Sequence, residues 1–334
     1  MDSFKNDKAY IIAEAGNNHE GSLERAIEMV SVASECGADA IKFQAIDPYE
    51  LVSKSDTERI KALKKFKLSF GDYSKLAKVC SDNKIDFLST PFDIKSAELL
   101  NNIQDSFKIA SGDNNFFPLI EKVFTFNKTI YISLGILEEE QLLELVNFLD
   151  ALKKKYSSNQ KICLLHCISS YPADNETLNL KRIQTLKKKF NQFVIGYSDH
   201  SIGILATSHA VAMGAEVIEK HFTLDKNLSD FRDHKLSADP DELKIMIQNI
   251  RMIESMLGDG IIGPQISEHQ MMIDAKRSIV ARKDIPKNTI ITQEHIKWIR
   301  PGDGIPPSKT NEILGKAAKV DISAETKIIK DFIS

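Results

Sequence analysis

The segment YIIAEAG, residues 10–16, sets a pattern that recurs through the first two thirds of the chain: an apolar run of strand length with a polar or glycine end. Each such run precedes a segment with helical periodicity, for example residues 22–36, 138–156 and 240–257. The other seven runs are AIKFQ (40–44), DFLSTPF (86–92), FKIASGD (107–113), TIYISLG (129–135), KICLLHC (161–167), FVIGYSD (193–199) and VIEKHFT (217–223). Eight alternations of strand and helix predict an α/β fold, a (β/α)8 TIM barrel.

Polar residues at the ends of these runs are the first candidates for an active site. In a (β/α)8 barrel, the chemistry lies at the carboxyl ends of the strands, where the connecting loops meet. The candidates from strand ends are Glu14, Lys42, Ser89, Lys108, Ser111, Asp113, Ser133, Ser198, His200 and His221.

Composition places limits on the kind of protein. The 334 residues are 42% hydrophobic and 27% charged, with a net charge of −3, so nothing indicates a nucleic-acid or membrane partner. The beginning MDSFKNDKAY has no apolar signal core, and the four cysteines lack zinc-type spacing. We therefore expect a cytoplasmic protein with reduced thiols.

The alternation of strand-type and helix-type segments ends after the helix expected at 240–257. We expect a barrel domain over residues 1–260, a linker over 261–275 and a small, mostly β domain over 276–334. The small domain contains short β-type pieces, RSIVAR and TIIT, between turn-rich segments. With about 60 residues it would be marginally stable alone, so docking on a partner surface is expected.

His200 and His221 follow consecutive strands and should be neighbours at the barrel rim. Two imidazoles plus waters suit Mn²⁺, Zn²⁺, Co²⁺ or a loosely held Mg²⁺, and ordinary hydrogen-bonded histidines are the alternative. His166 also ends a strand, but alternation with Cys167 favours the helix layer for its side chain.

Lys42 and Lys108 stand in otherwise apolar strands, where an unpaired ammonium group is costly. An internal ion pair with Glu14 or Glu219 is one interpretation. The other is an anion site, in which the two lysines and the hydroxyls of Ser111, Ser133 and Ser198 bind a phosphate.

Five further residues are candidates whose roles the residues alone leave open. Glu14 and Asp113 could accept a proton, bind a sugar hydroxyl or pair with the lysines. Tyr171 is suited to stacking on a polar substrate or to simple packing. Asp233 belongs to a long loop over the end of the barrel at which the strand-end candidates lie. Arg300, in the turn RPGDG, reads as a surface arginine from the sequence alone.

Taken together, these segments resemble the sialic acid synthase family, whose members condense phosphoenolpyruvate with an N-acylated sugar to make nonulosonic acids. The resemblance extends over residues 10–329, and the tail resembles the antifreeze-like (SAF) domain of that family. It is carried by IAEAGNNHEGSL, GADAIKFQ, FLSTPFD, KIASGD, HCISSYP, GYSDHSIG, GAEVIEKHFTLDK, DHKLS, RSIVARKDIPKNTIIT, IRPGDGI and LGKAA.

The resemblance implies a role for each matching position. The phosphoenolpyruvate contacts would be Lys42, Lys108, Ser111, Ser133 and Ser198, and the metal ligands His200 and His221. The sugar contacts would be Asp113, Tyr171, Asp233 and, from the partner subunit of a domain-swapped homodimer, Arg300; Ser169 would be a further substrate-binding residue. Glu14 matches an active-site glutamate that positions water or a proton. The implied cofactor is a divalent metal, Mn²⁺ first, with Mg²⁺ and Co²⁺ as alternatives.

The run Phe231-Arg232-Asp233-His234 departs from the Gly-Pro-Asp-His expected in the family, which bears on the identity of the sugar: N-acetylmannosamine or a 2,4-diacetamido hexose. Two other classes stay open on the residues alone. One is a barrel aldolase or epimerase that acts on a phosphosugar, and the other is a non-enzymatic protein that binds ice or a polysaccharide.

Overall fold

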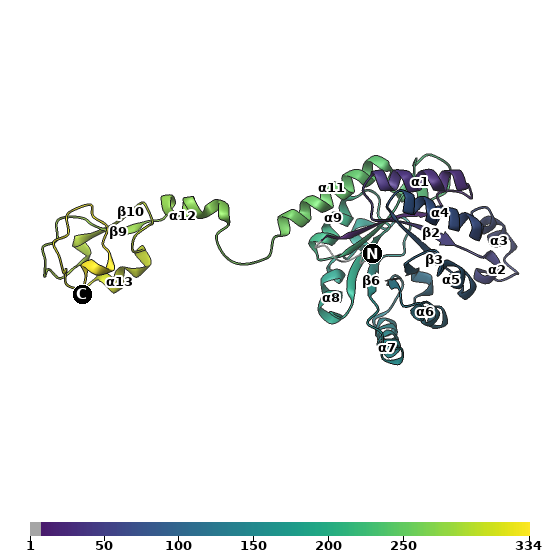
Figure 1. The fold of residues 1–334 in the computed structure, drawn as a ribbon, viewed down its shortest axis with the longest axis horizontal. Coiled ribbons are helices and arrows are strands. Elements are labelled where there is room, and N and C mark those ends of the chain that lie inside the picture. Colours follow the sequence, from purple (N-terminus) through teal and green to yellow (C-terminus); the bar gives the residue numbers. More distant parts are fainter. Residues whose placement is uncertain (1–7) are drawn as a thin grey trace. The chain divides into compact units, whose positions relative to one another are not determined.

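The structure is a computed structural model that describes residues 8–334. Its backbone divides into two compact units between Gly258 and Asp259, and each unit has its own hydrophobic core (Figure 1). No helix within residues 8–334 is both long and apolar enough to cross a membrane.

The first unit contains the eight predicted strands, all parallel to their neighbours, in the order β3-β2-β1-β8-β7-β6-β5-β4. The strands are β1 (Tyr10–Gly16), β2 (Ala40–Ala45), β3 (Asp86–Pro91), β4 (Ser106–Ile109), β5 (Thr129–Ser133), β6 (Ile162–Cys167), β7 (Val194–Asp199) and β8 (Val217–His221). This arrangement confirms the predicted TIM-type barrel.

The strands are joined by helices that cover the outside of the sheet (Figure 1). Their bounds are α1 (Leu23–Glu35), α2 (Pro48–Leu51), α3 (Thr57–Lys64), α4 (Phe70–Asp82), α5 (Ile94–Leu100), α6 (Phe117–Phe124), α7 (Glu139–Lys155), α8 (Lys181–Lys189), α9 (Leu205–Ala212), α10 (Asp233–Leu236) and α11 (Pro240–Leu257). The three helices expected at residues 22–36, 138–156 and 240–257 are confirmed as α1, α7 and α11. Their ends follow ordinary capping chemistry, since Ser22 accepts a hydrogen bond from the amide of Arg25 and Asp239 from that of Glu242.

The barrel has one seam, between β3 and β4. These strands are in contact but share no backbone ladder. The side chain of Gln104, just before β4, accepts a hydrogen bond from the Ser89 amide at 2.8 Å and donates to the Ser89 carbonyl at 3.2 Å. A buried amide side chain thus satisfies the backbone groups that a neighbouring strand would otherwise pair.

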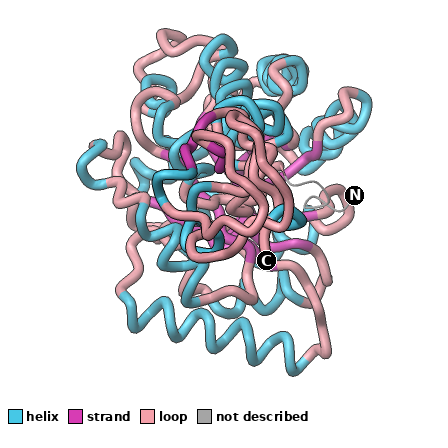
Figure 2. The backbone as a smooth tube through the Cα atoms, turned by 90° about the vertical axis from the view of Figure 1, so that its left-hand side faces the viewer, coloured by secondary structure: helices cyan, strands magenta, loops and turns pink. Residues whose placement is uncertain are grey.

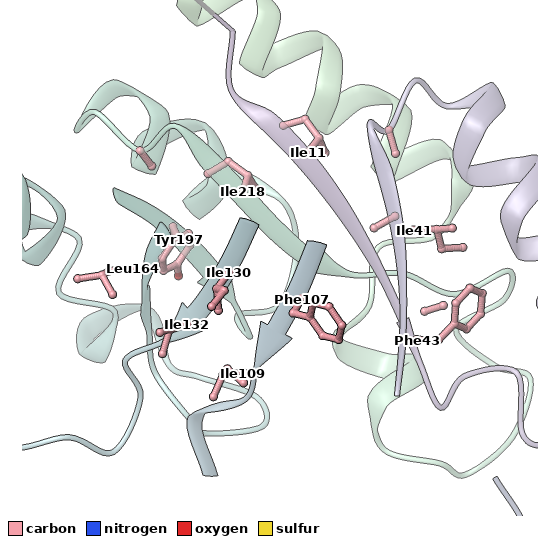
Figure 3. Packing of buried hydrophobic residues seen from close by; sticks show 14 of the residues in the cluster. Ile11, Ile41, Phe43, Phe107, Ile109, Ile130, Ile132, Leu164, Tyr197 and Ile218 are labelled. Carbon is pink, nitrogen blue, oxygen red and sulfur yellow. The ribbon is translucent and has the colours of Figure 1, made fainter. Parts of the chain in front are cut away.

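Alternation along the strands separates two apolar layers. Outward side chains such as Ile11, Phe43, Phe107 and Ile130 pack in the cluster beneath the helices (Figure 3). Inward ones form a smaller cluster inside the barrel: Tyr10, Ile12, Ala40, Leu88, Tyr131, Cys163, Leu165 and Val217. The side of the sheet on which a polar residue lies is therefore fixed by its position relative to these apolar neighbours.

The second unit is a small domain around an antiparallel pair, β9 (Ser278–Ala281) and β10 (Ile296–Ile299), and most of its backbone is loop (Figure 2). RSIVAR contains β9, as predicted. The segment TIIT, by contrast, forms no strand and contributes only an isolated bridge between Ile290 and Ala317. Short helices are α12 (His269–Ala275), within the segment expected as a linker, and α13 (Thr310–Ile313).

Candidate active site

A cavity of about 490 Å³ lies at the carboxyl ends of the barrel strands. Most of the residues predicted for the site line it together, although they come from strands and loops throughout the first unit. These are Glu14, Lys42, Lys108, Ser111, Ser133, Ser169, Tyr171, Ser198, His200, His221 and Asp233. The strand-end positions thus converge in the way the barrel fold requires.

Four charged side chains form a buried network on the cavity wall. Nζ of Lys42 lies 2.7 Å from Oε2 of Glu14 and 3.7 Å from Oε2 of Glu219, and Nζ of Lys108 lies 2.9 Å from Oε1 of Glu219. The hydroxyl of Ser198 donates to Oε1 of Glu219 at 2.8 Å. The charges of two ammonium groups and two carboxylates therefore balance one another. The ion-pair interpretation of the two lysines is correct for the protein without substrate.

The network perturbs the protonation of its members. Burial raises the pKa of Glu14, with Lys42 opposing the change. Burial alone would lower the pKa of Lys42, but Glu14 and Glu219 outweigh it and raise that pKa above its ordinary value. Burial likewise opposes ionisation of Glu219, yet Lys108 and Lys42 hold its pKa well below the usual range. Lys42 and Glu219 are thus charged at neutral pH, while Glu14 is the easier of the two carboxylates to protonate.

Hydroxyl groups beside this network lack partners. Oγ of Ser133 and Oγ of Ser169 are buried and form no hydrogen bond within the described chain. Ser169 and Ser111 both approach Gly135, just after β5, since a Cβ added there would stand 2.2 Å from Oγ of Ser169 and 2.6 Å from Oγ of Ser111. Unsatisfied buried donors in a polar cavity are suited to an anionic ligand.

His200 and His221 are neighbours, with ring centroids 5.3 Å apart. Nδ1 of His200 lies 2.7 Å from the carbonyl oxygen of Ile168, an arrangement that assigns the proton to Nδ1 and leaves Nε2 free. Burial holds the pKa of His221 well below its ordinary value, so this ring is neutral. For His200, burial lowers the pKa, but the Cys167 sulfur, 3.7 Å from Nδ1, and the Ile168 carbonyl raise it overall.

Tyr171 and Asp233 border the histidines on the open side of the cavity. The ring of Tyr171 lies with its centroid 4.1 Å from that of His200, and the guanidinium carbon of Arg232 lies 5.1 Å from the tyrosine centroid. Nε of Arg232 is 3.2 Å from Oδ1 of Asp233, a carboxyl group whose pKa burial raises. A polar ligand above the histidines would therefore meet an aromatic face, a carboxyl group and a guanidinium group.

One predicted sugar contact of the barrel, Asp113, does not line this cavity. Asp113 belongs to a 3₁₀ turn, Ser111–Asp113, rather than to the end of β4, and burial raises the pKa of its half-buried carboxyl group to about 6. Arg300 is exposed in the second unit, whose placement relative to the barrel is not defined.

Ser89 was predicted for the site, and this prediction is wrong. It shares the outward parity of Phe87 and of its register partner Phe43, so its hydroxyl lies buried on the outer side of the sheet and not in the cavity. Thr90, the next residue, faces inward and accepts a hydrogen bond from Lys42 at 3.2 Å. His166 is outward as expected: its Nε2 lies 2.7 Å from the carbonyl oxygen of Leu178.

Sequence reasoning missed several residues of the cavity. Gln44 donates to Oε1 of Glu14 at 2.9 Å, and its inward position two residues after Lys42 could have been read from strand alternation. Arg59, Leu63 and Phe66 reach the cavity from the segment that contains α3, and no local pattern marks them.

Comparisons with known proteins agree with this geometry. The model for the NeuB family matches residues 29–262, and that for the SAF domain matches residues 276–331. The N,N'-diacetyllegionaminic acid synthase of Campylobacter jejuni is 40% identical over 325 residues, 93% of this chain and 96% of that protein. The human N-acetylneuraminate-9-phosphate synthase is 31% identical over 341 residues, 97% of this chain and 92% of that protein.

A solved structure shares the fold as well. The N-acetylneuraminic acid synthetase of Leptospira borgpetersenii superposes with a TM-score of 0.74 at 37% identity, covering 79% of this chain and 90% of that one. Family match, relatives and barrel-mouth geometry agree, and the chain belongs to the NeuB family of sialic acid synthases, with a C-terminal SAF domain.

Proposed function

We propose that the protein is a nonulosonic acid synthase, a transferase that condenses phosphoenolpyruvate with the open-chain aldehyde of an N-acylated amino sugar and releases phosphate. The observation that carries the proposal is the pairing of Lys42 and Lys108 with buried carboxylates, next to the orphaned hydroxyls of Ser133 and Ser169. The sugar is N-acetylmannosamine or a 2,4-diacetamido hexose, in keeping with the products for which the N-acetylneuraminic acid synthetase and the N,N'-diacetyllegionaminic acid synthase are named.

Phosphoenolpyruvate would bind by exchange within the charge network. Its phosphate and carboxylate groups offer Lys42 and Lys108 new anionic partners, and the serine hydroxyls of the cavity supply neutral donors. Because the lysines already point into the cavity from β2 and β4, little rearrangement is needed, and the fixed charges can stabilise the transition state.

The reaction then proceeds at carbon. Carbon 3 of phosphoenolpyruvate forms a bond to the aldehyde carbon, whose C=O π bond opens so that its oxygen takes up a proton and becomes a hydroxyl. Water adds to the cationic carbon 2 and loses a proton, and the tetrahedral intermediate expels phosphate by cleavage of the C–O bond, which leaves a keto group. Glu14 is the group placed to take the proton of that water, because burial raises the pKa of its carboxyl group and the phosphate of bound phosphoenolpyruvate would compete with it for Lys42.

His200 and His221 would hold a divalent metal, with Mn²⁺ preferred over Co²⁺ and Mg²⁺. The residues fit this role: His221 is neutral, and His200 donates its other ring nitrogen to a backbone carbonyl, as metal-bound histidines commonly do. Among residues 8–334, no group of three or more His, Cys, Asp or Glu is arranged around one point, so water or substrate oxygens would complete the coordination. When bound, such an ion supplies Lewis-acid polarisation of an aldehyde oxygen.

Arg300 would complete the sugar site from the partner subunit of a domain-swapped homodimer. The turn that carries it is well held: Oγ of Ser278 donates to the carbonyl of Pro301 at 2.6 Å, and the amide of Gly302 donates to the carbonyl of Ile273 at 2.6 Å. Arg300 itself forms no hydrogen bond or ion pair within the described chain, which leaves its guanidinium group available.

The charge state of the lysines disfavours the rival aldolase. A Schiff base requires a neutral amine, whereas the pKa of Lys42 is raised and Lys108 is paired with Glu219. An inert binding protein likewise has no need of four buried charges around one cavity.

The test is a reaction screen with the full chain. Phosphoenolpyruvate, Mn²⁺ and a panel of amino sugars are incubated, inorganic phosphate is measured, and the product is identified by mass spectrometry as a nine-carbon keto acid. Phosphate release that depends on the sugar supports the proposal. Sugar-independent release, or a borohydride-trapped enzyme adduct, refutes it.

A further inference from the structure

A fully buried ion pair lies behind the cavity, on the outer side of the sheet. Nζ of Lys220 is 2.8 Å from Oδ2 of Asp199, and both side chains have an exposed fraction of 0%. The ammonium group also donates to the carbonyl of Ser201. Neither charged residue lines the cavity, so neither contacts the substrates of the proposed reaction.

The register of β7 and β8 places this pair between two pairs of cavity residues. Asp199 is the register partner of Lys220, just as Ser198 is the partner of Glu219. Side chains alternate along each strand, so Ser198 and Glu219 face inward, Asp199 and Lys220 outward, and the following histidines inward again. The outer ion pair therefore joins the two strands one residue before His200 and His221.

The same pair fixes the chain on both sides of His200. Oδ1 of Asp199 accepts hydrogen bonds from the Tyr197 hydroxyl at 2.9 Å, the Ser201 amide at 3.0 Å and the Ser201 hydroxyl at 2.8 Å. Asp199 precedes His200 and Ser201 follows it, while Lys220 directly precedes His221. The backbone at both histidines is thus tied to one set of polar contacts.

Stability does not explain why charged residues occupy these positions. Desolvation of a buried pair offsets most of its attraction, and apolar residues of similar volume would serve a helix-covered face as well or better. A directional ion pair does, however, fix how two strands lie relative to each other, which apolar packing does less strictly.

We propose that the Lys220–Asp199 ion pair is a positioning device, which holds the imidazoles of His200 and His221 at the separation needed to bind one divalent cation. The inference rests on the metal role proposed above. Groups hydrogen-bonded to the ligands of a metal site change metal affinity by about 10–100-fold when removed. Lys220 and Asp199 act one step further out, through the backbone at the two histidines, so that range is the upper limit of the effect.

The experiment compares Mn²⁺ binding by the full chain with binding by the double variant Lys220→Met/Asp199→Asn. This variant removes both charges together, and the asparagine retains an acceptor for Tyr197 and Ser201. Isothermal titration with Mn²⁺ should show weaker binding, by up to about 10–100-fold. Binding of phosphoenolpyruvate without metal should stay unchanged, because Lys42 and Lys108 are untouched.

Arg251→Met is the matched control for lost stability. Arg251 pairs with Asp39 at 3.3 Å and donates to the carbonyl of Ala9, just before β1 and far from the carboxyl ends of the strands. Its loss should lower the unfolding temperature and leave the affinity for Mn²⁺ unchanged.

Each outcome decides the proposal. Equal Mn²⁺ affinity of parent and double variant overturns it and leaves the metal site standing. A parent chain that binds Mn²⁺ no better than His221→Ala refutes the metal site and this inference with it. If the double variant does not fold, Ser201→Ala, which removes one donor to Asp199, is titrated instead; weaker binding supports the proposal and unchanged binding overturns it.

Discussion

Lys42 and Glu14 form an ion pair of 2.7 Å in which both side chains are almost completely buried, with exposed fractions of 3% and 2%. A pair so deep in the barrel costs desolvation energy on both sides, and an anionic substrate can relieve it by replacing Glu14 as the partner of the ammonium group. The contact thus keeps the ammonium group of Lys42 charged in the free protein. In the proposed reaction, its exchange for the substrate would free the carboxylate of Glu14.

Replacement of Lys42 by Met should therefore affect both activity and stability. Loss of one fixed charge at the transition state is expected to lower kcat about 10²–10³-fold. Leaving Glu14 unpaired should lower the free energy of unfolding by up to about 3–5 kcal/mol, less whatever protonation of Glu14 recovers. Steady-state kinetics and urea denaturation measure the two effects.

The control for this change is Lys67→Met, because Lys67 forms an ion pair of 3.0 Å with Asp47 at the surface. Exposed pairs contribute about 0–1 kcal/mol, so both readouts should remain near those of the parent. Equal losses in the two variants would contradict the role assigned to the buried pair.

Metal removal should abolish turnover if His200 and His221 hold the ion. Treatment with EDTA is expected to stop phosphate release, and Mn²⁺ or Co²⁺ to restore it. Either histidine replaced by Ala should lose activity and Mn²⁺ binding while circular dichroism shows an intact fold. Full activity in a rigorously metal-free preparation would refute the assignment.

Arg300 should act in trans. An Arg300→Ala chain and a His221→Ala chain, each inactive alone, are mixed under conditions that allow subunit exchange. Mixed dimers of the proposed domain-swapped form contain one site with only intact parts, so activity should return. With exchange verified by mass spectrometry, a mixture that stays inactive argues that Arg300 acts within its own chain or not at all.

His19 should make the fold sensitive to acid. Its ring is fully buried, and burial, with a smaller contribution from Arg25, lowers its pKa from 6.5 to about 4. Nδ1 accepts a hydrogen bond from the Gly21 amide at 3.0 Å, which requires the neutral ring. The unfolded chain binds a proton below pH 6.5 that the folded chain refuses until about pH 4, so stability is lost as the pH falls through this window.

The expected contribution of His19 is about 3 kcal/mol between pH 7 and pH 4. His19→Gln removes the titrating group, so its free energy of unfolding, measured by denaturant at several pH values, should fall less steeply than that of the parent. His269→Gln, at an exposed position, serves as the control. Identical slopes for parent and His19→Gln would contradict the prediction.

Much of the barrel could be predicted because each strand is a short apolar run with a strong local signal. The end of β4 could not: the strand stops at Ile109, and the chain then turns inward, where the Asn114 amide donates to the carbonyls of Ser133 at 3.3 Å and Gly135 at 2.9 Å. Those partners lie about one strand away along the barrel, so no local pattern encodes the turn. The strand β10 was missed for a similar reason, since Ile296–Ile299 is defined by its pairing with β9.

The residues of the candidate site also divide into those with a local sequence signal and those without one. Lys42 could be predicted because a charged residue in an apolar strand is conspicuous. The position of Ser89 near a strand end wrongly placed it in the site, whereas strand alternation puts its side chain on the outer side of the sheet. Both ion-pair partners, Glu14 and Glu219, were predicted, but the assignment of each to a lysine was not. Glu14 is the register neighbour of Lys42 on the adjacent strand, whereas Glu219 reaches Lys108 from β8, a non-local contact. Arg59 reaches the cavity through the arrangement of a helical insertion, again a non-local property.

The last prediction concerns which bond of phosphoenolpyruvate breaks. If water attacked phosphorus, the P–O bond would break and no water would be needed at carbon 2. If carbon 3 attacks the aldehyde, water must add to carbon 2, and a base must stand beside it. In the proposed reaction, Lys42 and Lys108 hold the phosphate and Glu14 takes the proton of the water, so we expect the C–O bond to break. Phosphoenolpyruvate labelled with ¹⁸O at the bridging oxygen should therefore yield labelled inorganic phosphate, measured by mass spectrometry. Label retained in the keto acid would mean P–O cleavage, and the roles proposed for Glu14 and the two lysines would have to be abandoned even if the product sugar were correct.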